Sequence, residues 1–164
     1  MTNPTSRTIF SSPQKAFQTF AIGEALTWSF LLGALAFRAL VGLPPTLFAF
    51  IGGTHGAMFL GYAVMAALVG VNQRWSFGRI VLGVLLAIVP FATLPFERNL
   101  AKNGLLVGAW RLQATSNPRD QHWFDRLFRW FLNRPLLLAA TLIVVVLAIF
   151  TTLLSLGSPT EWGN

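Results

Sequence analysis

Few residues of this sequence are of a type that could carry acid–base or metal chemistry. Its 164 residues include five Asp or Glu, two His and no Cys. The absence of Cys excludes thiol catalysis, disulfides and Cys-ligated metal sites. Glu24 and His55 stand out because each lies inside a long apolar stretch. An ionisable side chain is costly there, so it marks either a functional site or a charge-compensated pair.

The surrounding apolar stretches are long enough to cross a membrane. Hydrophobic residues make up 54% of the chain and charged residues 10%, a composition that excludes disorder and differs strongly from that of a soluble domain. A crossing helix needs about 20 mainly apolar residues. Four stretches qualify, at residues 17–41, 46–71, 77–96 and 135–156. The sequence therefore predicts an all-α fold, a polytopic membrane helical bundle with four transmembrane helices.

The predicted organisation has five parts along the chain. They are a short flexible tail (1–16), a three-helix membrane unit (17–98), a basic loop with an amphipathic interfacial helix (99–134), the fourth transmembrane helix (135–157) and a second tail (158–164). The first three apolar stretches are joined by tight turns, so we expect them to be antiparallel neighbours.

Depth arithmetic predicts which polar side chains can meet inside the bundle. With a rise of about 1.5 Å per residue in antiparallel helices, Glu24, His55 and Arg79 fall within one or two turns of each other in depth. These three residues form a predicted intramembrane polar cluster. Arg38 and Glu97 both fall near the opposite membrane face and form a second predicted polar pair.

Two interpretations of the first cluster stay open. Glu24 and His55 could handle a proton or a ligand, since burial and a charged neighbour would tune both pKa values. Alternatively, Glu24 and Arg79 compensate each other's charge and lock the packing of three helices. One buried His and one Glu supply two ligands, fewer than the three or four that zinc needs. We therefore expect neither a metal site nor a bound cofactor.

Small residues surround His55 in the second apolar stretch. Gly52 and Gly56 have the spacing of a GxxxG motif, which lets the backbones of two helices approach closely. We predict that Gly52, Gly53 and Gly56 form a helix-packing surface. A dinucleotide-binding role is not indicated, because no strand–turn–helix context accompanies these glycines.

The segment between the third and fourth stretches is basic and aromatic. Residues 97–134 hold seven of the twelve Lys and Arg residues. Apolar residues recur at helical spacing over residues 121–133 and leave one cationic face, which is typical of a helix lying in a membrane interface. An ordinary helix that caps the bundle is the alternative. The predicted interface residues are Trp123, Phe124, Arg126, Leu127, Arg129 and Trp130.

The basic residues indicate contact with membrane lipids but leave the orientation open. The net charge of +7 comes from cations that flank apolar stretches without any nucleic-acid motif, so we expect lipid headgroups, not nucleic acid, as their partners. With four crossings, the basic loop and the amino terminus lie on opposite sides of the membrane. The loop favours a cytoplasmic position for itself, whereas Arg7 and Lys15 favour one for the amino terminus.

Four sequence elements follow one another in the first two thirds of the chain. They are Glu24–Trp28 (EALTW), Gly53–Gly56 (GTHG) followed by Tyr62, Arg74–Arg79 (RWSFGR) and Pro90–Arg98 (PFATLPFER). Together they resemble the DUF3817 integral membrane domain of bacteria over about residues 16–100. The resemblance implies a three-helix unit of a multi-pass protein in the bacterial cell membrane, and no assigned activity. The loop, the interfacial helix and the fourth stretch lie outside it.

The function that these observations favour is non-catalytic. We find no nucleophile–base pair, metal-ligand set or phosphate-binding loop, whereas hydrophobic surface is plentiful. We expect a small accessory or assembly subunit of a larger membrane complex, for example a respiratory complex, or a homo-oligomer. The alternatives are an oligomeric transporter or proton-coupled carrier that uses Glu24 and His55, and a lipid- or quinone-binding membrane protein.

Overall fold

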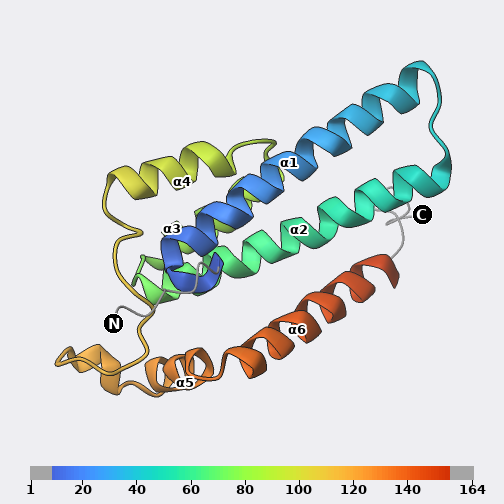
Figure 1. The fold of residues 1–164 in the computed structure, drawn as a ribbon. Coiled ribbons are helices and arrows are strands. Elements are labelled where there is room, and N and C mark those ends of the chain that lie inside the picture. Colours follow the sequence, from blue (N-terminus) through green and yellow to red (C-terminus); the bar gives the residue numbers. More distant parts are fainter. Residues whose placement is uncertain (1–8, 156–164) are drawn as a thin grey trace, which may run out of the picture. The chain divides into compact units, whose positions relative to one another are not determined.

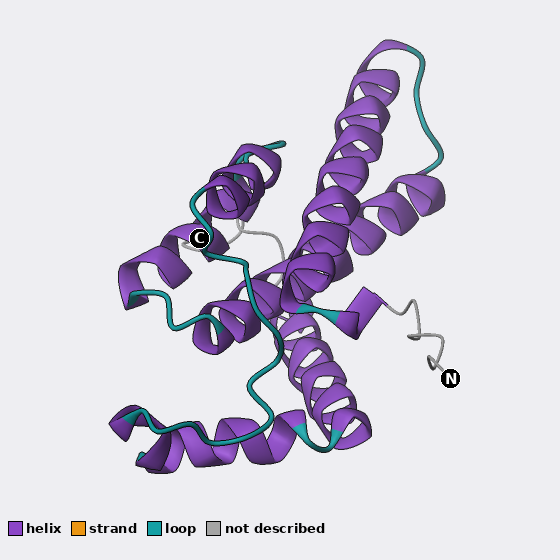
Figure 2. Cartoon of the chain, turned by 60° about the vertical axis from the view of Figure 1, so that its left-hand side comes forward, coloured by secondary structure: helices purple, strands orange, loops and turns teal. Residues whose placement is uncertain are grey.

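Residues 9–155 are described by a computed structural model, and every regular element within that range is a helix (Figure 1, Figure 2). The predicted all-α class is confirmed. The first eight residues and the predicted tail at 158–164 lie outside the described residues. The α-helices are α1 (Pro13–Leu40), α2 (Pro45–Asn72), α3 (Phe77–Leu85), α4 (Thr93–Lys102), α5 (Trp123–Leu132) and α6 (Pro135–Ser155).

The chain divides into two compact units, residues 1–109 and 110–164. The first unit contains α1 to α4 and, with them, Glu24 and His55. The second unit contains α5, which is the predicted interfacial helix, and α6.

The first two helices are long, and α1 begins at a well-defined cap. Ser12 accepts a hydrogen bond from the Lys15 backbone N–H at 3.2 Å, and Pro13 occupies the first turn, where its missing N–H has no partner to lose. Gly42 adopts a positive φ of 85° in the link to α2, a conformation that glycine reaches readily. Each helix has 28 residues and is about 42 Å long, enough to cross a hydrocarbon core.

The contacts between α1 and α2 run in opposite order along the two helices. The Phe17 ring lies 5.5 Å from the Tyr62 ring, near the start of α1 and in the second half of α2. Farther along α1, Thr27 lies 3.1 Å from the His55 imidazole, which precedes Tyr62 on α2. The helices are therefore antiparallel.

After α2 the chain makes a hairpin of two short arms instead of a third crossing helix. The first arm is α3 continued by a short 3-10 helix, Leu86–Ile88. It reaches the level of Trp28, whose indole N–H donates to the Ala87 carbonyl at 3.1 Å. Pro90 then interrupts the helical path, and Phe91 takes a positive φ of 65° in the turn.

The second arm of the hairpin, α4, returns to the level at which the first arm began. The Phe96 ring on α4 lies 6.2 Å from the ring of Trp75, which precedes α3. The Trp75 indole N–H also donates to the Leu105 carbonyl, just beyond α4, at 2.8 Å. Both ends of the hairpin thus meet at Trp75, and the predicted third crossing over residues 77–96 is corrected.

Three helices of the described residues are long and apolar enough to cross a membrane, namely α1, α2 and Pro135–Leu153 of α6. The chain is a membrane protein, and the predicted count of four crossing helices is not confirmed. No residue in the most apolar window of α6 is buried. An apolar surface of this extent is stable only against lipid or against another protein surface.

Candidate functional site

Glu24 is fully buried on α1. The hydroxyl of Thr93, at the start of α4, donates to Glu24 Oε2 at 3.0 Å and also lies 3.3 Å from the Ala21 carbonyl of α1. Oε1 of Glu24 has no hydrogen-bond partner. Burying a carboxyl group is costly unless hydrogen bonds compensate for lost water, so the hairpin supplies the donor that makes this position tolerable.

The side chain of Thr27 connects His55 on α2 to the backbone of Glu24 on α1. His55 Nδ1 is 3.1 Å from Thr27 Oγ1, and that hydroxyl donates to the Glu24 backbone carbonyl at 2.9 Å. The centroid of the Trp28 ring lies 4.5 Å from that of the imidazole. Because the Trp28 indole is bonded to Ala87, the hairpin positions the surroundings of both Glu24 and His55.

Arg79 does not join this cluster, and the predicted charge compensation of Glu24 is corrected. The ion pairs between described residues all lie in the second unit. Arg79 is partly exposed near the start of α3, whereas Glu24 lies about 16 Å along α1 from its start. The described residues include no group of three or more His, Cys, Asp or Glu that could hold a metal ion.

Arg38 and Glu97 are far apart, so the second predicted polar pair is wrong. Glu97 follows Phe96, whose ring packs 6.4 Å from that of Phe17 near the start of α1. Arg38 lies in the last turn of α1, about 30 Å away along the helix axis. The pairing assumed a crossing helix, whereas α4 returns to the side where α1 begins. Burial raises the pKa of the Glu97 carboxyl, which lies outside the three crossing helices, and the adjacent Arg98 opposes that rise.

Close packing occurs at glycines other than Gly52 and Gly53, two of the three predicted ones. A Cβ atom on Gly52 or Gly53 would meet no atom within 4 Å, and Gly56 is partly exposed. By contrast, a Cβ atom on Gly83 of α3 would lie 2.9 Å from the Phe96 ring of α4. The hairpin arms therefore use glycine for close approach, and the face of α2 around Gly52 and Gly53 is left open within the unit.

The residues around Glu24 and His55 all lie within a region of the chain that matches known sequences. Residues 14–102, more than half of the chain, match the model of DUF3817, a domain of unknown function. The chain belongs to the DUF3817 family. A sequence of Streptomyces coelicolor (strain ATCC BAA-471 / A3(2) / M145), named only as a candidate membrane protein, is 34% identical over 105 residues. This match covers 63% of the chain but only 12% of that relative. No solved structure matches the chain.

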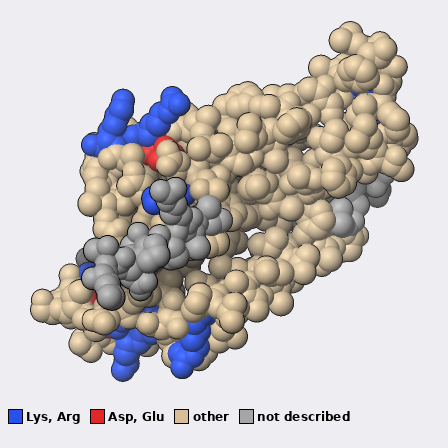
Figure 3. All heavy atoms as spheres, in the orientation of Figure 1, with Lys and Arg blue, Asp and Glu red and all other residues tan. Residues whose placement is uncertain are grey.

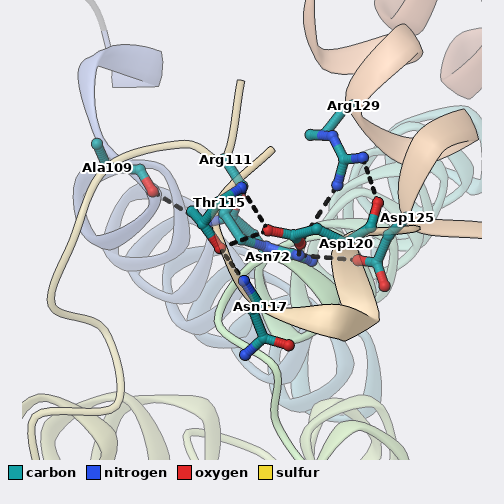
Figure 4. Close-up of polar contacts among 8 residues, drawn as sticks. All are labelled: Asn72, Ala109, Arg111, Thr115, Asn117, Asp120, Asp125 and Arg129. Atoms are coloured by element: carbon teal, nitrogen blue, oxygen red, sulfur yellow. Dashed lines mark hydrogen bonds and ion pairs between the residues drawn. The ribbon is translucent and has the colours of Figure 1, made fainter. Parts of the chain in front are cut away.

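Outside the matched region, the second unit holds a polar cluster that the sequence analysis missed. Asp120 is 1% exposed and accepts hydrogen bonds from the Thr115 N–H and hydroxyl at 2.8 and 2.6 Å (Figure 4). Arg111 and Arg129 pair with the same carboxylate at 3.2 and 3.3 Å, and Arg111 also pairs with Asp125 at 2.8 Å. These five residues, called the Asp120 cluster below, tie the basic loop to α5.

A sequence signal for the Asp120 cluster did exist. Asp120 and Asp125 are the only acidic residues between positions 98 and 160, in a segment with many cations. Two isolated carboxylates among several Arg residues favour ion pairs. The spacing along the chain alone does not reveal which Arg residues the loop brings to them.

The predicted apolar residues of α5 are exposed, but one of its two predicted interface cations, Arg129, is buried. The exposed side chains of α5 are Trp123, Phe124, Arg126, Leu127 and Trp130, and Arg126, Leu127 and Trp130 line a shallow depression. Arg129 is only 8% exposed, and its Nη2 donates to the Asp120 carbonyl at 2.5 Å. Arg129 is therefore engaged within the protein, and its predicted contact with lipid phosphate is corrected.

Proposed function

We propose that the chain is a non-catalytic accessory or assembly subunit of a larger complex in the bacterial cell membrane. The apolar surface of α6 supports this most strongly, because no residue in its most apolar window is buried and lipid or another protein surface must cover it. A respiratory complex is one class of assembly that such a subunit suits.

The open face of α2 is the surface that we assign to a partner helix. Gly52 and Gly53 have no neighbour within 4 Å of a Cβ position, and Phe50, one turn before Gly53, is 72% exposed. Helices in lipid associate largely through close packing at small residues. Membrane lipid or a further copy of the chain would cover this face in the absence of a partner.

Native isolation tests the subunit proposal. The tagged full chain, expressed in its own host and extracted in mild detergent, should migrate as a complex of defined stoichiometry. Replacing Gly52 and Gly53 together by Leu should dissociate that complex. Gly33→Leu is the matched control, because Gly33 on α1 also has no neighbour within 4 Å of a Cβ position. A wild-type chain that migrates as a lone monomer would contradict the proposal.

A second candidate function is proton-coupled transport by an oligomer. Glu24 favours it, because the carboxyl is fully buried and one of its oxygens has no partner. Burial of an unpaired ionisable group in a membrane helix is typical of proton-handling sites. Reconstituted liposomes with an internal pH dye should then acidify under a proton gradient. Glu24→Gln should abolish the flux and Glu97→Gln should leave it intact.

A further inference from the structure

The Thr27 hydroxyl contacts both the Glu24 backbone carbonyl and the His55 ring, so its proton is linked to the tautomer of the neutral imidazole. The Thr27 hydroxyl lies 2.9 Å from the Glu24 backbone carbonyl and 3.1 Å from His55 Nδ1. A carbonyl can only accept, and the hydroxyl has a single proton, so it donates either to the Glu24 carbonyl or to Nδ1, depending on the tautomer of the ring. When it donates to Glu24, the shorter of the two contacts, Nδ1 donates to the Thr27 oxygen and Nε2 of the neutral imidazole is a bare acceptor. The site proposed below uses this tautomer.

Nε2 of His55 is unpartnered and reaches the surface of the first unit. Among the described residues, the enclosed polar side-chain atoms without a hydrogen bond are Glu24 Oε1 and Tyr62 Oη. Nε2 is not enclosed in this way, and no hydrogen bond from the described residues reaches it. The residue as a whole is 8% exposed. A molecule arriving from the lipid can therefore meet this acceptor.

The surroundings of the imidazole suit a flat ring. The Trp28 and Phe59 rings have their centroids 4.5 and 6.4 Å from that of His55. Gly52 lies one turn before His55 on the same face of α2, and a Cβ atom there would meet nothing within 4 Å. Aromatic neighbours and open space next to a single acceptor favour an aromatic ligand with one hydroxyl directed at Nε2.

The depth of His55 restricts the ligand to lipid-soluble molecules. His55 is ten residues into α2, which is about 15 Å from the start of that helix and thus near the middle of a hydrocarbon core of about 30 Å. We propose that His55, Trp28 and Gly52 form a binding site for a lipid-soluble hydroxylated ring, of the quinol class, whose hydroxyl donates to His55 Nε2. A ligand in the open space at Gly52 is an alternative to the partner helix assigned to that space above, so the site does not depend on the accessory role.

Ligand selectivity tests this site in the full chain, purified and held in lipid nanodiscs without oxygen. Three probes share the same ring substituents and alkyl tail and differ at the two oxygens that are hydroxyls in the quinol. They are decylubiquinol, decylubiquinone and the dimethyl ether of the quinol. Only the quinol can donate, so it should bind about tenfold more tightly than the other two, as one hydrogen bond allows. His55→Leu should remove that preference. Thr27→Val should reduce it, because Nε2 can then carry the proton.

Thr54→Val is the matched control for Thr27→Val. Thr54 adjoins His55, but its hydroxyl donates to the Phe50 carbonyl of its own helix at 2.8 Å, so the quinol preference should persist. Equal affinities for the three probes, no binding of any probe, or a preference that survives His55→Leu would each overturn the proposal. Nitrogen NMR of His55 adds a ligand-free readout, since a protonated Nε2 and a bare Nδ1 would overturn it directly.

Discussion

Glu24 illustrates how a carboxyl group is accommodated inside an apolar helix pair. Its Oε2 accepts from the Thr93 hydroxyl, and its Oε1 has no partner. A buried group that is left without a donor loses its full solvation. The Thr93 contact therefore has more influence on stability than an ordinary hydroxyl–carboxyl contact at a surface.

Double-mutant cycles distinguish this contact from the ion pair that the sequence suggested. Thr93→Val and Glu24→Leu should show a coupling energy of about 1–2 kcal/mol, because each change removes one side of the same hydrogen bond. Arg79→Gln and Glu24→Gln should instead be additive within about 0.5 kcal/mol. Thermal unfolding in detergent measures both cycles. Strong coupling of Glu24 to Arg79 would show that the charges compensate each other.

Asp120 has an equally specific role in the second unit. Asp120→Asn should lower the local stability of the basic loop by about 3 kcal/mol, because two Arg side chains lose the charge that neutralises them. Asp125→Asn is the matched control. Among the described residues that carboxylate pairs with Arg111 alone, and its side chain is 18% exposed, so the loss should be about 1 kcal/mol or less. Hydrogen exchange of the amides of residues 111–117 reports the difference, and equal losses would contradict it.

At the scale of elements, hydropathy predicts the long helices but not the hairpin. The predicted helices at 17–41 and 46–71 recur as α1 and α2 because length and apolar composition suffice to define them. The direction of the chain after Pro90 depends on contacts between distant segments, such as Trp28 with Ala87. Composition carries no information on such contacts.

The same distinction explains which site residues the sequence placed correctly. Glu24 and His55 come together because their relative depth requires only that α1 and α2 are antiparallel. Arg79, and the pair of Arg38 with Glu97, required the hairpin to cross the membrane, and those predictions failed with it. The Asp120 cluster depends on the path of an irregular loop, which has no periodicity to read.

Glycine substitutions test the packing of the hairpin arms. Gly83→Ala should destabilise the protein by about 1–3 kcal/mol, because the new methyl group meets the Phe96 ring, which is held by Phe17 and Trp75. Gly78→Ala on the same helix should stabilise it by up to about 1 kcal/mol, since that position is open. Thermal unfolding of the two variants is the measurement. Two stabilising substitutions would show that the arms do not pack as described.

Helix α5 should bind the membrane surface chiefly through its aromatic side chains. Trp123→Ser with Trp130→Ser should release the helix, whereas Arg126→Gln should weaken attachment by about 1 kcal/mol, as one cation near an anionic leaflet does. Arg129→Gln should disturb the Asp120 cluster instead of lipid binding. Tryptophan quenching by lipid-borne quenchers measures attachment. Stronger quenching by aqueous iodide would contradict it and would favour a protein partner at α5.

At the scale of the molecule, the hairpin gives a different distribution of charge across the membrane from the one that four crossing helices would give. With α1 and α2 as crossing helices, the start of α1 and both ends of the hairpin lie on one side. Between residues 9 and 109, Arg38 then belongs to the other side, and the five remaining cations belong to this one, namely Lys15, Arg74, Arg79, Arg98 and Lys102. In the first unit, cations gather at the end where α4 finishes (Figure 3). We expect this side to be cytoplasmic.

Labelling of single cysteines tests the hairpin most directly, because the natural chain has no Cys. Exposed positions flank the hairpin at Ser76 and Asn103, and Val41 marks the opposite end of α1. Each is replaced by Cys in turn and treated with a membrane-impermeant maleimide in intact cells and in inverted vesicles. Ser76→Cys and Asn103→Cys should react only in inverted vesicles, and Val41→Cys only in intact cells. If Asn103→Cys reacted on the same side as Val41→Cys, residues 77–102 would cross the membrane and the hairpin would be wrong.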